Sequence, residues 1–458
     1  MIKTSLKIIL IATVTLVFVF AFSSSYNSHN IDHLDYVIAI GIDKAPSEDN
    51  LQISFEFTDL SAFSESKSSN LSDPIINSVV ASSIPEAINL MNAYAGKQLS
   101  LSHCKVVVFS EDVAQNGISK EITYLMNDTQ IRPTTNIIIA TETAKDYIKN
   151  SSSSLEGILT KYYDIFPTSA DYTGYTSNIL LGQFYRNLTN TESGAVAILG
   201  TKSKNESQSN SSNKKNSISS DGSSQNNTSN DESSLNSTNN NSETNDTSSN
   251  TSTQSTHLEK SSDNSSLDNL SPGFAIVDGD RGTENIGLAV FKDDKYIDKL
   301  SAIDTLCYSL IENAVDTFNI CINSPFEENK KIDISVSSLE PAFTNINLSK
   351  DVPVITIKLN LTGKTLTGQE NLHISDSSTL TKINDSMKDY LSSKMKDYLY
   401  KTSRNYKCDL NGFYKLAKKK FLTIPDYTNY NWNEKYPSAE FNIEIQSNII
   451  SSLLIQDF

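Results

Sequence analysis

The chain has 458 residues, which is enough for two or three domains, and a formal net charge of −16. Such an acidic balance disfavours binding to nucleic acid, or to anionic lipid headgroups, through a broad basic surface. The four cysteines show no CxxC or Cys/His spacing, which argues against a zinc site. Cys307 and Cys321 could form a disulfide in an exported protein, and buried free thiols are the alternative.

The N-terminus has the layout of an export signal. Lys3 and Lys7 precede an uncharged apolar run from Ile8 to Phe22, followed by serines. The run is slightly shorter than the roughly 20 apolar residues that span a bilayer core, so cleavage after Ser23 and retention as an anchor are both open. We therefore predict a signal or anchor segment at residues 1–25, at most one membrane crossing, and an extracytoplasmic location for the rest.

Strands and helices alternate in the first half of the chain. Leu34–Ile42 and Leu51–Thr58 are rich in alternating apolar residues and predict an antiparallel hairpin. Ser83 has capping-box spacing to Glu86 and predicts a helix start. The expected apolar face of that helix is Ala87, Leu90, Met91 and Tyr94. Further strands are expected at 105–109, 135–140 and 195–199, with helices at 110–125, 143–149 and 178–188, which together indicate a partly parallel sheet.

A polar tract from Thr201 to about Asn269 interrupts this pattern. It consists almost entirely of Ser, Asn, Thr, Asp and Lys, and such a composition cannot bury enough apolar surface to offset its ordering entropy. The tract is therefore predicted to be disordered. Strand-like runs at Ala195–Leu199 and Gly287–Phe291 flank it, so we expect an insertion within a folded unit, which the slow growth of loop-closure entropy permits.

The second half predicts another group of strands and helices. A hairpin is expected at 287–291 and 296–300, then a helix at Ser301–Phe318, strands at 332–337 and 354–361, and a helix at 410–421 before a strand at 441–449. A long amphipathic helix is expected at Thr379–Lys401, with Leu380, Ile383, Met387, Leu391, Met395 and Tyr398 as its apolar stripe. The predicted fold is α+β and multi-domain, with mixed sheets flanked by helices and a long disordered insertion. Its domains are expected at 26–200 and 271–458 around the insertion at 201–270, with room in the second for a small middle domain.

Two groups of residues could suggest catalysis. Ser102-His103-Cys104 joins three reactive types, but neighbours in an extended segment point to opposite faces and cannot form a triad. Asp32, Asp35 and Asp43 could imitate a hydrolytic carboxylate pair, although surface and turn positions explain them as well. The sequence contains no GxGxxG, GxxxxGK, GxSxG or HExxH motif. We therefore assign no catalytic, cofactor-binding or metal-binding residues, and the sequence favours a non-enzymatic binding or assembly role.

Several stretches, taken in order, resemble the Ger(x)C family, the C-type subunit of bacterial spore nutrient germinant receptors. Family members characteristically read Cys-Trp-Asp-x-x-Glu-Ile-x-x-Leu and then a strand ending Gly-Ile-Asp. They also carry Ser-His-x-Lys, Glu-x-x-Ala-x-x-Gly-Ile and Gly-x-Ala-Val-Phe segments, and Trp-x-x-x-Phe-Pro near the C-terminus. The corresponding segments here are Tyr26–Leu34, Ile40-Gly-Ile-Asp43, Leu101–Lys105, Glu111–Ile118, Met126–Arg132, Gly287–Lys292, Phe413–Tyr427 and Trp432–Pro437.

The resemblance implies a non-enzymatic subunit without a cofactor on the outer face of the spore inner membrane. Its implied partners are an A-type subunit and a permease-like B-type subunit, and its implied fold is a three-domain mixed α/β architecture. Family members are lipoproteins, but the alignment places Ser25 where the acylated cysteine belongs. Serine cannot form the thioether, so a lipid anchor is not expected here, and the run from Ile8 to Phe22 is expected to anchor the protein instead.

Two other classes of protein remain open. One is an extracytoplasmic, membrane-anchored solute- or cell-wall-binding protein that uses the polar tract as a spacer. A saturable small ligand would distinguish it by raising the melting temperature through mass action. The other is a hydrolase without a recognised motif.

Overall fold

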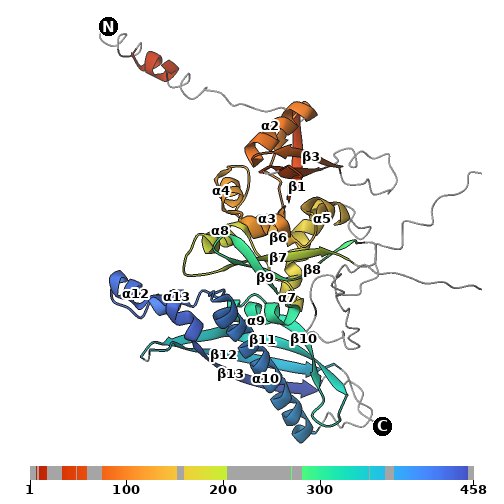
Figure 1. Ribbon diagram of the computed structural model, residues 1–458, viewed down its shortest axis with the longest axis vertical. Helices are drawn as coiled ribbons and strands as arrows, with labels where there is room; N and C mark the ends of the chain where they lie inside the picture. Colours follow the sequence, from red (N-terminus) through yellow and green to blue (C-terminus); the bar gives the residue numbers. More distant parts are fainter. Residues whose placement is uncertain are drawn as a thin grey trace, which may run out of the picture. The chain divides into compact units, whose positions relative to one another are not determined.

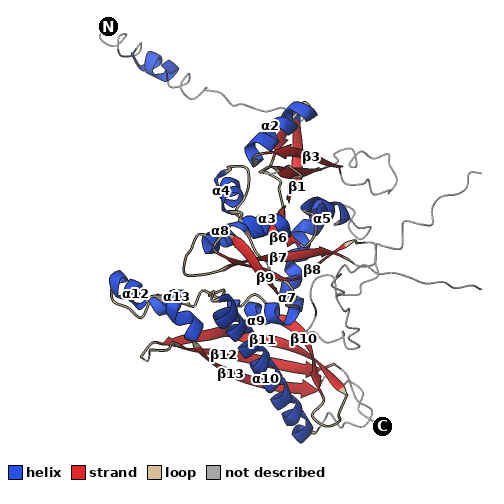
Figure 2. Cartoon of the chain, in the orientation of Figure 1, coloured by secondary structure: helices blue, strands red, loops and turns tan. Residues whose placement is uncertain are grey.

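The fold is known from a computed structural model (Figure 1), which describes residues 7, 10–17, 33–47, 49–58, 75–151, 159–203, 270, 281–349, 351–366 and 376–451. These residues all lie within one compact unit of the chain. They form two mixed sheets flanked by helices, drawn in red and blue in Figure 2, which confirms the α+β prediction.

The larger sheet has nine strands in the order β3-β2-β1-β5-β6-β7-β8-β9, with β4 beside β1. Strands β1, β5, β6 and β7 run parallel, and the remaining pairs of the main path are antiparallel. The partly parallel sheet and both predicted hairpins are therefore confirmed. The bounds are β1 Leu34–Lys44, β2 Leu51–Phe57, β3 Ile75–Ala81, β4 Gln98–Ser100, β5 Val106–Ser110, β6 Asn136–Ala140, β7 Ala195–Lys202, β8 Thr283–Lys292 and β9 Lys295–Leu300.

Strands β7 and β8 bracket the polar tract. They are antiparallel neighbours, with Lys202 opposite Thr283, so the tract connects two adjacent strands as an insertion should. The tract itself, beyond residue 203, lies outside the described residues. Its expected start at Thr201 was two residues early, because Thr201 belongs to β7 and accepts a 2.6 Å hydrogen bond from Thr141 Oγ1.

Helices connect the strands of the larger sheet. Their bounds are α2 Ile84–Ala95, α3 Glu111–Asn116, α4 Ser119–Asn127, α5 Ala144–Asn150, α6 Leu159–Ile165, α7 Ala170–Thr173 and α8 Leu181–Leu188, with a 3₁₀ turn at Phe166–Ser169. Ser83 caps α2 as expected, but the Glu86 carboxylate accepts from Ser82 N at 2.9 Å, so the capping box is not reciprocal. The expected apolar face was half wrong. Leu90 and Tyr94 are 44% and 78% exposed because the main contacts of α2 among the described residues are with β3 and β4, on its other face.

The smaller sheet has the order β10-β11-β12-β13. Its last two strands are parallel and are joined through α10, whose predicted apolar stripe is buried from Ile383 to Tyr398. The bounds are β10 Thr317–Asn323, β11 Lys331–Asn347, β12 Val354–Thr365, β13 Glu440–Ser451, α9 Ala302–Glu312, α10 Ser377–Tyr400, a π-helical turn at Lys401–Tyr406, α11 Tyr414–Lys418, α12 Ile424–Tyr430, α13 Trp432–Lys435 and a 3₁₀ turn at Tyr436–Ser438.

Two predicted helices in this half were too long. The helix expected to reach Phe318 ends at Glu312, because Asn313 adopts a left-handed conformation (φ 56°) and Phe318 already belongs to β10. The helix expected at 410–421 is reduced to α11. The four cysteines form no disulfide with one another, so the possible bond between Cys307 and Cys321 is absent, and Cys321 is only partly buried.

The N-terminal apolar run is described only in part. Residues 10–17 are helical, with side chains such as Leu10 and Val17 66% exposed. Within the described ranges, no helix is both long and apolar enough to cross a bilayer. The prediction of a signal or anchor rests mainly on residues outside those ranges.

Candidate functional site

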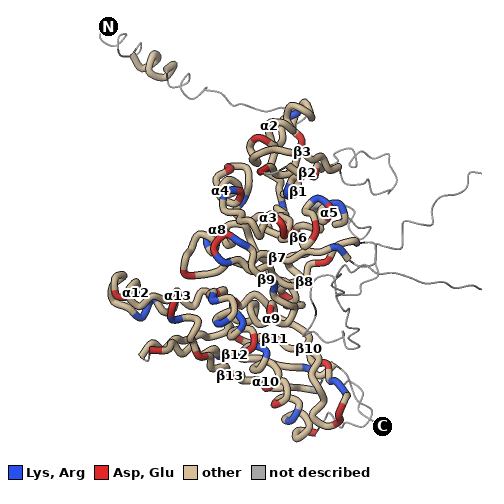
Figure 3. Tube along the Cα trace, in the orientation of Figure 1, with Lys and Arg blue, Asp and Glu red and all other residues tan. Residues whose placement is uncertain are grey.

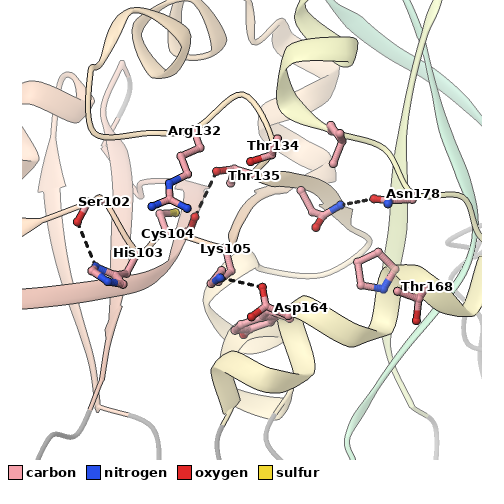
Figure 4. A pocket seen from close by; sticks show the side chains of 14 residues that line it. Ser102, His103, Cys104, Lys105, Arg132, Thr134, Thr135, Asp164, Thr168 and Asn178 are labelled. Carbon is pink, nitrogen blue, oxygen red and sulfur yellow. Dashed lines mark hydrogen bonds and ion pairs between the residues drawn. The ribbon is translucent and has the colours of Figure 1, made fainter.

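A polar pocket of about 240 Å³ lies beside the beginnings of β5 and β6 (Figure 4). Two of the segments that carry the family resemblance, Leu101–Lys105 and Met126–Arg132, meet at this pocket although 20 residues, 106–125, separate them in the sequence. Its lining residues are Ser102, His103, Cys104, Lys105, Arg132, Thr134, Thr135, Asn136, Tyr163, Asp164, Pro167, Thr168, Asn178 and Leu180.

Ser102 and His103 form one wall of the pocket. They lie in a tight turn that the backbone hydrogen bond from Cys104 N to Leu101 O closes at 3.0 Å. Ser102 Oγ lies 3.1 Å from His103 Nδ1, and the His103 ring packs edge-on against Tyr36 at 4.9 Å. The expectation that these neighbours point apart was therefore wrong, because the segment is a turn and not an extended strand.

Cys104 does not complete a nucleophilic triad with them. Its side chain is buried, and Sγ donates to the carbonyl oxygen of Val106 at 3.4 Å. Burial raises the pKa of the thiol to about 12. The nucleophile in cysteine chemistry is the thiolate, so Cys104 remains an inert structural thiol at neutral pH.

The charges at the pocket do not cancel. Lys105 pairs with Asp164 at 2.8 Å, whereas the exposed Arg132 side chain has no hydrogen-bond or ion-pair partner within the described part of the chain. Figure 4 shows the guanidinium of Arg132 on the same side of the pocket as His103 and Lys105. Within the described residues, the positive charge of Arg132 at the pocket is therefore not compensated. Such a charge suits a small anion, because guanidinium pairs strongly with carboxylate and phosphate oxygens.

The opposite wall is held in place by hydrogen bonds. Thr135 Oγ1 donates to the carbonyl oxygen of Cys104 at 3.2 Å. Asn136 Nδ2 donates to Asn178 Oδ1 at 2.9 Å, which leaves the amide nitrogen of Asn178 at the rim. These contacts fix the two strand entrances against each other and give the pocket a defined shape.

A buried carboxyl group, that of Glu56, lies behind the pocket. The Tyr163 hydroxyl donates to Glu56 Oε2 at 3.1 Å, and Glu56 is 0% exposed. Burial raises the pKa of Glu56 to about 8. The alternating pattern of β2 put Glu56 on the face expected to be polar, but Tyr163 of α6 contacts that face, so this buried group could not be found from the strand alone.

The Gly-Ile-Asp segment has a structural role. Asp43 is 5% exposed, and its carboxylate accepts from the backbone nitrogens of Ala144 at 2.6 Å and Lys145 at 3.0 Å, which caps α5. A Cβ atom on Gly41 would lie 2.9 Å from Ile148 Cδ1, so glycine permits α5 to pack directly on β1. Burial raises the pKa of Asp43, although the two backbone donors oppose the shift.

The three aspartates considered for hydrolysis therefore do not form a catalytic pair. Asp35 forms a partly exposed ion pair with Lys97 at 3.2 Å, as expected for a surface residue. Asp43 was expected on the surface as well and is instead a buried helix cap. Asp32 lies outside the described residues. Across the described ranges, no group of three or more His, Cys, Asp or Glu side chains could hold a metal ion.

We expect the Asp43→Ala substitution to lower the free energy of unfolding by about 2 kcal/mol or more, because it leaves two backbone donors at the start of α5 without a charged acceptor. Urea denaturation measures the change. Asp35→Ala is the matched control, since a partly exposed ion pair contributes only about 0–1 kcal/mol. Equal losses of free energy for the two substitutions would show that the Asp43 cap stabilises the fold no more than a surface ion pair does.

Two family models match the segments that carry these motifs. The family model for the spore germination protein N-terminal domain matches residues 27–202, and the model for the spore germination B3/GerAC-like C-terminal domain matches residues 286–452. No curated protein matches the chain. A solved structure, the crystal structure of the GerBC protein, aligns with 90% of this chain and 96% of its own length, at 12% identity and a TM-score of 0.48. Because the two family models together cover most of its length, the chain belongs to the Ger(x)C family of spore germination proteins.

Proposed function

We propose that this protein is a non-catalytic C-type subunit of a spore nutrient germinant receptor. It acts by assembling with an A-type subunit and a permease-like B-type subunit at the outer face of the spore inner membrane. The observation that carries the proposal is the pair of family matches, 27–202 and 286–452, which fall on the two halves of the folded chain. The buried, protonated thiol of Cys104 and the helix-capping role of Asp43 support a role without catalysis.

The proposal includes how the chain attaches to the membrane. Ser25 stands at the position of the lipidated cysteine in the family, so the apolar run from Ile8 to Phe22 is proposed to remain as the anchor. We also propose two domains on either side of a disordered insertion. The expected limits were 26–200 and 271–458, and the first domain extends to Lys202 because β7 ends there. Membrane fractionation tests the anchor: protein that is soluble without detergent and begins near Ser24 would exclude it.

Deletion of the gene tests the receptor role directly. We expect loss of germination with one or more nutrients, without a change in the number of spores formed. Co-purification of the tagged protein with both other subunits tests the assembly. Unchanged germination with every nutrient tried would contradict the proposal.

The pocket supplies a test at the level of a single residue. We expect Arg132→Gln to slow nutrient-triggered germination about tenfold. A factor of about ten corresponds to losing one charge-assisted hydrogen bond from Arg132 to an anionic group bound in the pocket. Immunoblotting should show an unchanged amount of the subunit. Arg186→Gln is the matched control because Arg186 is also an exposed arginine, on α8. A normal germination rate for Arg132→Gln would show that the charge of Arg132 in the pocket is not needed for germination. The family assignment would be unaffected.

A second candidate function is an extracytoplasmic, membrane-anchored solute- or cell-wall-binding protein. The observation in its favour is the uncompensated Arg132 in a pocket with polar walls. A screen of small anions by thermal shift separates the two functions, because a ligand that binds only the folded state raises its melting temperature. Stabilisation by a wall fragment or solute, together with normal germination after gene deletion, would favour this second function.

A further inference from the structure

The segment from the start of α11 to the end of α12 is basic, unlike the rest of this acidic chain. Residues 414–430 contain four lysines and one aspartate, a net charge of +3, whereas the whole chain carries −16. Lys418, Lys419 and Lys420 are consecutive and exposed. Blue segments lie next to α12 in Figure 3. The lysines therefore form a local basic cluster of a kind that the overall composition does not reveal.

Two apolar side chains project directly after the lysines. Leu422 is 100% exposed and Ile424 is 69% exposed. Buried apolar side chains stabilise a fold by roughly 1.5–3 kcal/mol each, so these two residues contribute almost none of that stabilisation to the isolated chain. We call residues 418–424 the Lys-Leu loop.

The loop has a defined shape. Between the two exposed residues and the lysines, Phe421 turns inward and packs against Tyr427 at 5.6 Å and Tyr430 at 5.2 Å. Thr423 caps α12, and Pro425 occupies its first turn. This inward aromatic contact and the helix start hold Leu422 and Ile424 outward, so their exposure is built into the fold.

Among the described residues, no ion pair neutralises the lysines of the loop. Lys420 Nζ lies 3.4 Å from the neutral Asn345 Oδ1, and Lys418 lies over the Tyr427 ring at 5.7 Å. The acidic groups in this part of the fold have other partners: Asp426 accepts from Thr423 Oγ1 at 2.7 Å, and Asp351 lies 4.0 Å from Lys435. The positive charge of the loop is therefore available to an external anion.

We propose that the Lys-Leu loop binds an anionic membrane surface, with Leu422 and Ile424 in the acyl boundary and the three lysines at the headgroups. Exposed leucine and isoleucine beside lysines are the composition of interfacial membrane segments. Protein–protein interfaces are instead depleted in lysine and enriched in Tyr, Trp and Arg. The inference rests on the proposed membrane location of the protein, and it adds a second contact to the N-terminal attachment.

A fluorescent reporter at residue 422 tests the proposal in the full-length chain. Leu422→Cys is labelled with an environment-sensitive dye in a Cys321→Ser background, since the other three cysteines are buried. Ile165→Cys is the control because Ile165 is also an exposed aliphatic residue, at 47%, but it follows Asp164 instead of lysines. Both proteins carry the same N-terminal segment, so only the local environment of the dye differs between them.

Vesicles with about one third phosphatidylglycerol should shift the emission of the label at 422 to the blue, and lipids with a quencher in the acyl chain should quench it. The label at 165 should not respond. Replacing the three lysines by glutamine should weaken binding at 422 about a hundredfold, since each lysine near an anionic surface contributes roughly 1 kcal/mol, a factor of about five. Raising the salt concentration should also weaken binding to the anionic vesicles, because salt screens the charges of the lysines and headgroups.

Three results would overturn the proposal: no response at 422 with anionic vesicles, an equal response with neutral phosphatidylcholine vesicles, or a response only after addition of the purified A-type and B-type subunits. The last would assign the loop to a protein partner. Failure of the gene deletion to alter germination would refute the receptor role and leave the vesicle result standing, so the two proposals can fail separately.

Discussion

The Glu56→Gln substitution is expected to remove the part of the stability loss that Glu56 causes as the pH rises from about 4.5 to about 8. Burial raises the pKa of Glu56 from its ordinary 4.5 to about 8. A raised pKa means that the folded state binds this proton more tightly than the unfolded state. The contribution is therefore fully present below pH 4.5 and is lost as the pH rises to about 8, by on the order of 5 kcal/mol.

Urea denaturation of the wild type and the variant at several values between pH 5 and pH 9 measures this difference. The gap between the two proteins should widen with pH in favour of the glutamine variant. Burial also raises the pKa of Asp409, to about 7. Asp409 therefore causes a similar decline in the free energy of unfolding of both proteins, and this decline cancels in the comparison. Glu86→Gln is the control because Glu86 is exposed, and a pH-independent gap for Glu56→Gln would show that Glu56 is ionised in the fold at neutral pH.

The Gly287→Ala substitution is expected to lower the free energy of unfolding by about 3 to 5 kcal/mol, the sum of backbone strain and overpacking. Gly287 lies in β8 with φ at 89°, where β7 and β8 shift register, and its nitrogen donates to Tyr175 O at 2.7 Å. A Cβ atom there would lie 2.3 Å from the backbone oxygen of Leu300. Since this oxygen belongs to the main chain, no side-chain rotation can relieve the contact.

Gly96→Ala separates the two causes. Gly96 also has a positive φ, 67°, at the end of α2, but a Cβ atom there would meet nothing within 4 Å. Its replacement should therefore lower stability by only about 1 kcal/mol, the conformational part alone. Denaturation midpoints of the two variants, measured side by side, test this. Equal losses of stability for Gly287→Ala and Gly96→Ala would mean that β9 can move away from the new Cβ atom at residue 287 at no cost in free energy.

Much of the fold could be predicted from local patterns. The hairpins β1–β2 and β8–β9, the parallel strands β5 and β6 and the stripe of α10 follow from alternation, apolar runs and 3.6-residue periodicity, which depend on neighbours in the chain. Strand β3 was missed because its edge position leaves Ile75 and Val80 nearly half exposed, so its apolar residues show no clear burial pattern. The end of α9 was misplaced because Asn313 was not recognised as a left-handed terminator.

The candidate site depended on contacts between distant segments. The motif pieces at 101–105 and 126–132 were noticed in the sequence, but only the parallel pairing of β5 with β6 brings them to one pocket. Likewise, Asp43 looked like a turn residue until α5 was seen to place two backbone donors on it. The burial of Glu56 required α6 to contact the outer face of β2.

The sequence by itself therefore determined the family, the α+β class and the insertion of the polar tract between two strands, because motif order, periodicity and composition are properties of neighbouring residues. The tertiary structure decided which side chains lose water and which remain exposed. Burial depends on what packs over a residue from elsewhere in the chain. That is why Glu56 and Asp43 proved to be buried carboxyl groups, and why Leu422, apolar by composition, remains fully exposed.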